Sequence, residues 1–230
     1  LTVAASGVLN FGGNNTKVFT GGSLTNFGLV VWPSTGPNLW YFNTTHFQNQ
    51  PGGLVDLQMD GSFTPNSGSS DFLNAGTLRK SAGAGVSQVV VGFTNAGAVE
   101  VQSGTLQFPV GFASSSGMNV AAGAVLDLLG GTFTLAPGHT FTGNGFYGVA
   151  GGNAFVNGPI INTNFMLTAG SLTLSNQIAG VLRWVGGNLA GDVTVAAGGV
   201  LDFGGNNTKV FTGGSLTNHG LIVWPNTGPN

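Results

Sequence analysis

The chain begins with LTVAASGVLNFGGNNTKVFTGGSLTNFGLVVWPSTGPN (residues 1–38) and ends with VTVAAGGVLDFGGNNTKVFTGGSLTNHGLIVWPNTGPN (residues 193–230). The two segments align from Leu1 with Val193 to Asn38 with Asn230 without a gap, and they differ at 6 of 38 positions. Self-similarity at a fixed period is typical of a repeat architecture. The sequence therefore predicts one full repeat unit over residues 1–192, followed by the start of the next unit over 193–230. We expect the two segments to occupy equivalent places, related by a translation along the molecule.

The composition excludes several function classes. Only 5% of the residues are charged and the net charge is −2, so no basic surface is predicted for nucleic acid. Cysteine is absent, which excludes disulfides, thiolate metal sites and a cysteine nucleophile. The apolar runs fall far short of the roughly 18 residues that would span a bilayer, so no membrane span is predicted in this segment.

A shorter period lies beneath the long one. Asn-x-Gly or Ala-x-Gly recurs before alternating apolar residues, and most of these glycines follow one another at similar intervals. The longer interval from Gly145 to Gly180 predicts one degenerate turn near residues 164–166. From Gly7 to Gly199 this makes about nine turns of roughly 21 residues each. The glycines of the pattern are Gly7, Gly28, Gly53, Gly76, Gly97, Gly123, Gly145, Gly180, Gly199 and Gly220.

These turns predict an all-β chain. Short runs alternate apolar and polar residues, as in 98–101 and 105–108, and glycine, asparagine, serine and proline separate them. Successive turns resemble each other, so like positions would stack on like in a parallel coil, and parallel crossovers are right-handed in nearly all proteins. We therefore predict a right-handed parallel β-helix, or β-solenoid. Asparagines at its corners would form ladders of side-chain amides.

One stretch interrupts the alternation. Residues 32–50 are rich in aromatic side chains and contain Pro33 and Pro37, which predicts a lateral loop. Aromatic rings can stack on sugars or contact a neighbouring filament, and they can equally pack over the flank of the coil. The candidate binding residues of this loop are Trp32, Trp40, Tyr41, Phe42 and Phe47, and Trp224 repeats Trp32.

The repeated units resemble a known class of protein. Residues 93–106, 180–189 and 193–203 are similar to the units of bacterial β-strand-repeat surface proteins, which are very long secreted chains in the style of autotransporter passengers and filamentous adhesins. The resemblance implies a β-solenoid and an extracellular or cell-surface location. It implies no catalytic residue and no cofactor.

The acidic residues give few signs of a catalytic site. Asp127 and Asp202 hold equivalent places in two related turns, and Asn10 fills that place in the first copy. Because asparagine cannot replace a general acid, we expect a solvent-facing strand position there.

A second acidic group consists of Asp56, Asp60 and Asp71. They lie close together in the sequence and could bind calcium or act on a glycosidic bond. Arg79 and Lys80 are the nearby basic residues.

Two further patterns carry no metal signature. Gly12–Thr16 and Gly204–Thr208 resemble glycine-rich calcium turns without the aspartates that those turns need. His46, His139 and His219 stand far apart and lack metal-ligand spacing. We predict no metal site and no cofactor.

Three functions remain open. The favoured one is a structural tandem repeat of an extracellular filament or giant surface protein, which is not an enzyme. The alternative is a carbohydrate-binding or adhesin module that uses the aromatic loop, and the third is a polysaccharide-degrading β-helix enzyme. Expected partners are further copies of the chain, glycans or neighbouring filaments.

Overall fold

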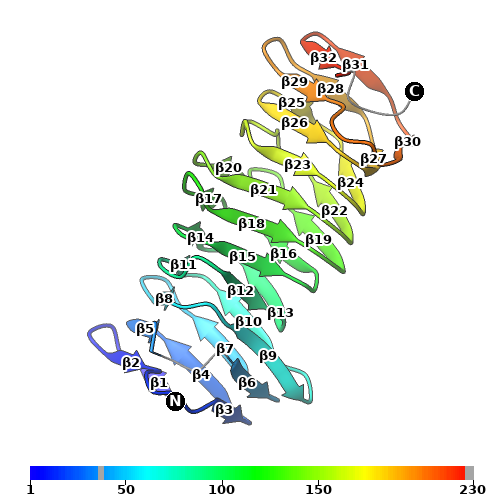
Figure 1. Ribbon diagram of the computed structural model, residues 1–230. Helices are drawn as coiled ribbons and strands as arrows, with labels where there is room; N and C mark the ends of the chain where they lie inside the picture. Colours follow the sequence, from blue (N-terminus) through cyan, green and yellow to red (C-terminus); the bar gives the residue numbers. More distant parts are fainter. Residues whose placement is uncertain (36–38, 226–230) are drawn as a thin grey trace.

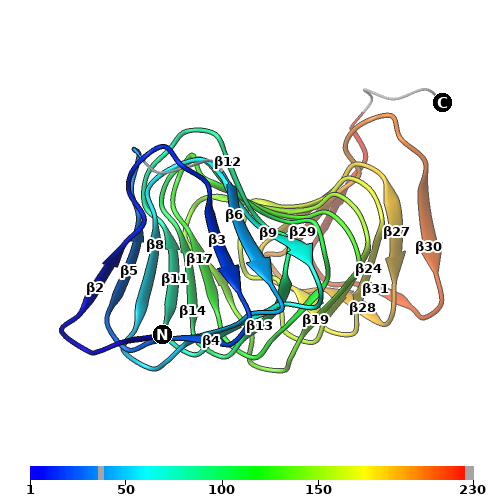
Figure 2. The same cartoon turned by 90° about the horizontal axis from the view of Figure 1, so that it is seen from below.

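The protein is a parallel β-solenoid in a computed structural model that describes residues 1–35 and 39–225. The chain winds about one long axis, with the N-terminal turns at one end and the C-terminal turns at the other (Figure 1). Successive turns add strands to three faces, as the view in Figure 2 also shows, although between β22 and β23 the second face has only an isolated bridge at Ile160. Ten steps along the first sheet lead from Thr2 to Thr212, which confirms the short period predicted from the glycines. The predicted fold class is confirmed, and the right-handed sense of the coil stays a prediction.

The strands form four sheets, of which the second and fourth follow one another along the same side of the coil. The bridge from Ile160 to Ile178, and the bond from Asn162 Nδ2 to Gly143 O at 2.8 Å, connect that side between the two sheets. The first sheet contains β1 (Thr2–Val3), β4 (Ser23–Asn26), β7 (His46–Asn49), β10 (Asp71–Asn74), β13 (Gly92–Asn95), β16 (Phe112–Ser114), β19 (Thr132–Leu135), β22 (Asn153–Val156), β24 (Ser171–Leu174), β27 (Gly187–Ala190) and β30 (Lys209–Thr212).

The other sheets are equally regular. The second contains β2 (Val8–Asn10), β5 (Leu29–Trp32), β8 (Leu54–Leu57), β11 (Thr77–Lys80), β14 (Ala98–Val101), β17 (Met118–Val120) and β20 (Phe141–Thr142). The third contains β3 (Lys17–Thr20), β6 (Leu39–Asn43), β9 (Ser62–Ser67), β12 (Val86–Val89), β15 (Thr105–Phe108), β18 (Val125–Leu128), β21 (Phe146–Val149), β23 (Phe165–Leu167), β26 (Val181–Trp184), β29 (Val200–Asp202) and β32 (Leu221–Val223). The fourth contains β25 (Gln177–Ile178), β28 (Val193–Val195) and β31 (Leu216–Asn218).

Like side chains stack in columns because the strands pair in register. On the first sheet Phe47, Phe72, Phe93, Phe112 and Phe133 are register partners in five successive turns. Their neighbouring ring centroids lie 4.5 to 5.6 Å apart, and all five rings are buried. The alternate residues of each strand point outward, so the period-2 pattern of the sequence becomes a core inside the coil and a largely polar surface outside.

A buried ladder of amides runs along one corner of the coil. Asn26 Nδ2 donates to Asn49 Oδ1 at 2.8 Å, Asn49 Nδ2 to Asn74 Oδ1 at 2.8 Å, and Asn74 Nδ2 to Asn95 Oδ1 at 2.7 Å. Asn95 Nδ2 ends the ladder on Ser114 Oγ at 3.0 Å. The first three of these side chains also donate to backbone carbonyls, so their buried polar groups are satisfied. The predicted amide ladder is confirmed.

Glycine beside the ladder allows the backbones of successive corners to touch. A Cβ atom at Gly97 would collide with the carbonyl oxygen of Gly76, and one at Gly76 would collide with that of Gly53. The Asn-x-Gly pattern of the sequence thus combines an amide that bonds to the next turn with a residue small enough to let that turn approach.

The two copies of the repeated segment lie on different faces. Nine steps along the first sheet lead from β1 to β27, and β28, the copy of β1, is the next strand on the following face. Likewise β2 belongs to the second sheet and its copy β29 to the third, while β3 belongs to the third and its copy β30 to the first. One repeat unit, residues 1–192, therefore covers nine complete turns of the coil and one face of the next turn. The prediction that a translation alone relates the copies was wrong.

We predict that the amide ladder is a main determinant of stability. Replacing Asn49 by Ala removes an acceptor for Asn26 and leaves Asn74 Oδ1 and the carbonyls of Gly53 and Thr77 without this donor. Each buried group left unpaired costs about 1–3 kcal/mol, so the free energy of unfolding should fall by about 3 kcal/mol. Urea unfolding followed by circular dichroism measures the change.

The matched control is Gln48→Ala, because Gln48 lies on the same strand and points to the partly exposed side. Its effect should stay within about 0.5 kcal/mol, as is usual for surface positions. Equal effects of the two substitutions would contradict the role of the ladder.

Candidate functional site

The aromatic residues predicted to form a binding loop lie mostly in the core. Trp32, Trp40 and Phe42 are each 1% exposed and Phe47 is fully buried, while Tyr41 on the outward side is partly exposed. Residues 39–43 and 46–49 form the strands β6 and β7 of the coil, so the prediction of a lateral loop over 32–50 was wrong for these residues. Residues 36–38 of that prediction lie outside the described residues.

Trp40 is the centre of this aromatic cluster. Its ring centroid lies 4.0 Å from that of Phe11, 5.5 Å from Trp32, 5.0 Å from Phe63 and 5.9 Å from Phe19. A ring enclosed on so many sides has no face left for a sugar. The alternation of Trp40 and Phe42 with Tyr41 is a strand pattern, and the prolines before it obscured that pattern in the sequence.

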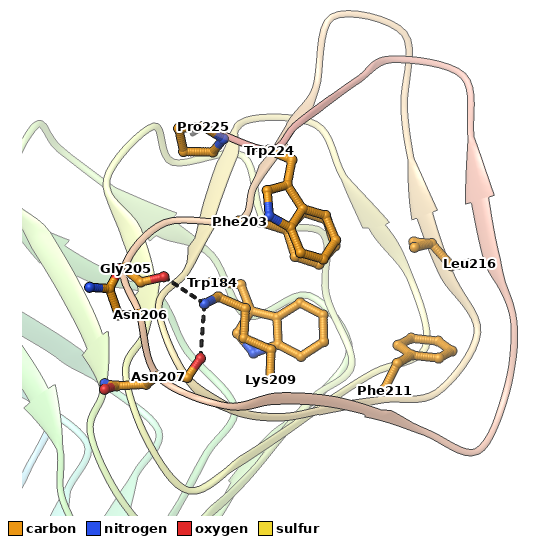
Figure 3. A pocket seen from close by; sticks show the side chains of 10 residues that line it. All are labelled: Trp184, Phe203, Gly205, Asn206, Asn207, Lys209, Phe211, Leu216, Trp224 and Pro225. Carbon is orange, nitrogen blue, oxygen red and sulfur yellow. Dashed lines mark hydrogen bonds between the residues drawn. The ribbon is translucent and has the colours of Figure 1, made fainter. Parts of the chain in front are cut away.

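The second copy presents the same residue types at an exposed surface. Trp224, the copy of Trp32, is 78% exposed and stacks on Phe203 with ring centroids 4.8 Å apart. Together with Trp184, Lys209, Phe211 and other residues, these rings line a cavity of about 320 Å³ at the C-terminal end of the coil (Figure 3). The comparison of the two copies is the sequence signal that could have located this cavity.

Lys209 forms the polar edge of this end cavity. Its Nζ donates to Gly205 O at 3.0 Å and to Asn207 O at 3.1 Å, as the dashed lines in Figure 3 show. The ammonium group therefore closes the glycine-rich turn 204–208 on itself. In the first copy Lys17 Nζ similarly donates to Asn15 O at 2.9 Å. In each glycine-rich turn a lysine therefore has a structural role, because it bonds to backbone carbonyls. This agrees with the absence of the aspartates that a calcium-binding turn would need.

The three acidic residues of the candidate calcium or glycosidase site do not converge. Asp56 accepts a bond from Gln58 Nε2 at 2.9 Å, and Asp71 Oδ2 lies 2.9 Å from His46 Nδ1. Asp60 pairs with Lys80, whose Nζ lies 2.8 Å away. No group of three or more metal-ligating side chains gathers anywhere in residues 1–35 and 39–225.

The Lys80 ammonium group is fully buried yet well bonded. Besides Asp60 Oδ1, it donates to Ala82 O at 3.0 Å, and the other oxygen of Asp60 accepts the backbone N–H of Gly85 at 2.9 Å. Buried charges persist in proteins when they are paired and hydrogen-bonded in this way. This pair fastens the corner after β11, so its charges have a structural role.

The remaining acids and histidines are also dispersed. Asp127 and Asp202 lie at outward positions of β18 and β29, as predicted, but they are only partly exposed there, and burial raises the pKa of Asp127. Asp202 Oδ2 lies 3.5 Å from Arg183 Nε. His219 is exposed, whereas His139 is 1% exposed and packs edge-on against Phe141, with ring centroids 4.7 Å apart. The sequence around His139 gives no sign of this burial.

Comparisons with protein-family models, curated proteins and solved structures found no match to this chain. Among the described residues, no helix has the length and apolar character needed to cross a membrane.

Trp40→Ala tests the structural role of the aromatic cluster. Removing a buried tryptophan leaves a large cavity among its neighbouring rings, so the free energy of unfolding should fall by about 3–5 kcal/mol. Tyr41→Ala, one residue along the same strand and outward-facing, should cost less than about 1 kcal/mol. Chemical denaturation of both variants measures the difference. If Trp40→Ala left stability unchanged and Tyr41→Ala reduced it, the assignment of inward and outward faces would be wrong.

Burial of His139 predicts a loss of stability in acid. Burial lowers the pKa of His139 from 6.5 to about 4. Well above pH 6.5 the imidazole is neutral in both folded and unfolded chains, so it adds no pH dependence there. Below that pH the unfolded chain binds a proton that the folded chain does not take up until about pH 4. Stability should therefore fall by about 3 kcal/mol as the pH is lowered through this window.

The measurement is urea unfolding at neutral pH and at a pH just above the lowered pKa, for the native chain and for His139→Leu. Other titrating groups are common to both proteins, so their effects cancel in the difference. The variant should lose less stability on acidification, whereas an identical loss in both proteins would rule out this role of His139.

Proposed function

We propose that the chain is a structural tandem-repeat segment of an extracellular filament or giant cell-surface protein, similar to the bacterial β-strand-repeat surface proteins. Its role is mechanical rather than catalytic. Each turn provides a template of backbone hydrogen bonds for the next, and stability accumulates from contacts between neighbouring turns. The partners in this proposal are further copies of the same unit, arranged end to end.

The burial of equivalent residues in the two copies carries the proposal. Leu24 is fully buried and Trp32 is 1% exposed in the first copy, where β7 and β8 of the following turn pair with their strands. Their copies Leu216 and Trp224 are 37% and 78% exposed. The same side chains thus become core residues when a further turn of this sequence lies upon them. A unit whose end is completed by its own repeat is suited to continuous assembly.

The dispersal of ionisable groups supports a non-catalytic role. Catalysis by general acids and bases needs such groups to meet within hydrogen-bond reach of one substrate. In the described residues most of the acids are held in separate pairs, each with its own lysine, arginine, histidine or glutamine. A fold held by backbone bonds and buried rings, with few charges and no cysteine, also suits an extracellular location.

The face shift between copies gives the proposed filament a defined symmetry. Neighbouring turns of parallel strands are about 4.8 Å apart, so nine and one-third turns advance by about 45 Å. Each unit would be rotated by one third of a turn relative to the preceding unit, since its strands begin one face later. Three units would restore the original faces after roughly 130 Å.

Cryo-electron microscopy of filaments from the native source tests the proposal. Helical reconstruction should give an axial rise of about 45 Å per unit together with a rotation of one third of a turn, before any supercoiling. A recombinant chain of three tandem units provides the control for rise and rotation within a single molecule. Finding only discrete monomers at the source would overturn the proposed filament, and units related without rotation would contradict the proposed symmetry.

A further inference from the structure

The end cavity has a direct counterpart inside the molecule. Its walls include Phe203, Lys209, Phe211, Leu216 and Trp224. The corresponding residues of the first copy are Phe11, Lys17, Phe19, Leu24 and Trp32, which are the same residue types in the same order.

In the first copy the indole of Trp40 lies among these counterparts. It is in ring contact with Phe11, Phe19 and Trp32, at 4.0, 5.9 and 5.5 Å between centroids. The cavity of about 320 Å³ in the second copy therefore corresponds to the place that Trp40 takes in the first.

We propose that the end cavity is a socket for a tryptophan carried by a strand with the sequence of β6, LWYFN, from the next unit of this repeat. The occupant is thus a further copy of this chain's own sequence. This proposal rests on the proposed function for the source of the strand, but the fit between strand and socket can be tested separately.

Backbone pairing specifies how the strand would enter. β6 pairs in parallel with β3, with Lys17 opposite Trp40 and Phe19 opposite Phe42. The copy of β3 is β30, which is the last strand of the first sheet within the described residues. A β6-like strand paired with β30 in the same register would place its tryptophan opposite Lys209 and its phenylalanine opposite Phe211.

The amide ladder provides a second point of recognition. Asn218 is the copy of Asn26, and its Oδ1 accepts the backbone N–H of Gly220 at 3.1 Å, as Asn26 Oδ1 accepts that of Gly28 at 3.1 Å. In the first copy Asn26 Nδ2 also donates to Asn49 of the following turn. An incoming turn that carries the counterparts of both Trp40 and Asn49 would therefore fill the socket with its tryptophan and extend the amide ladder from Asn218 with its asparagine.

The experiment extends the chain by one turn. Residues 39–61 are appended after Asn230, the copy of Asn38, so that the extended chain repeats the order of the first unit. Acrylamide quenching reports the exposure of Trp224, and the same extended chain with Trp224→Phe isolates its signal. In a matched control, the appended copy of Trp40 is replaced by Ser.

In the extended chain we expect the quenching constant of Trp224 to fall at least about threefold, because an exposed ring becomes a core ring like Trp32. The melting temperature should rise by roughly 5 °C. The Ser control should lose most of both effects. Equal protection in the extended chain and the control would overturn the socket, since any cover would then suffice, and no protection in either would overturn it as well.

Soluble oligosaccharides added to the unextended chain test the competing occupant. Protection of Trp224 by cellohexaose or chitohexaose, without protection by the appended strand, would overturn the proposal in favour of a glycan site. Protection by the appended turn alone would support the socket even if the native source held only monomers, so this result and the failure of the proposed filament can be told apart.

Discussion

In-register hydrogen bonding between successive turns is the constraint on which the rest of this structure depends. Once each strand pairs in parallel with its counterpart, every side chain faces the same position of the next turn about 4.8 Å away. Phenylalanine therefore meets phenylalanine, and asparagine donates to asparagine. Repeated like charges at this spacing would repel, which accounts for the 5% of charged residues. The exceptions, such as Arg79 opposite Glu100, place opposite charges in register.

The same in-register pairing concentrates uncovered core side chains at the ends of the coil. Along the sides, outward residues are mostly polar and the core is closed by sheets on three faces. At an end, the last turn has core side chains on a surface that another turn would cover. The repeated segment shows this difference between interior and end within one molecule, because Trp32 is 1% exposed and its copy Trp224 is 78% exposed. In the proposed filament, assembly would use the same kind of interface as folding.

Much of the architecture could be predicted from local patterns. The degenerate turn expected near residues 164–166 contains strand β23, and the asparagine side chains at the corners form the expected ladder. The face shift cannot be seen in the glycine spacing, because glycines mark two kinds of corner. Gly97 lies between the first and second sheets, whereas Gly123, the next glycine of the pattern, lies between the second and third. The corner of the preceding turn that matches the corner of Gly123 contains Gly104, whose carbonyl accepts the N–H of Val125. Spacing alone cannot distinguish these corners.

The order of residues along the chain is enough to establish a parallel coil of short, regular turns, because period-2 alternation and corner glycines are local properties. Three-dimensional packing decided which corner each glycine occupies, and hence that one repeat unit covers nine turns and one face. Packing also decided that Trp40 is enclosed by Phe11, Trp32 and Phe63 rather than carried on a loop. Burial depends on what the following turn places above a side chain, and that neighbour lies a full turn away in the sequence.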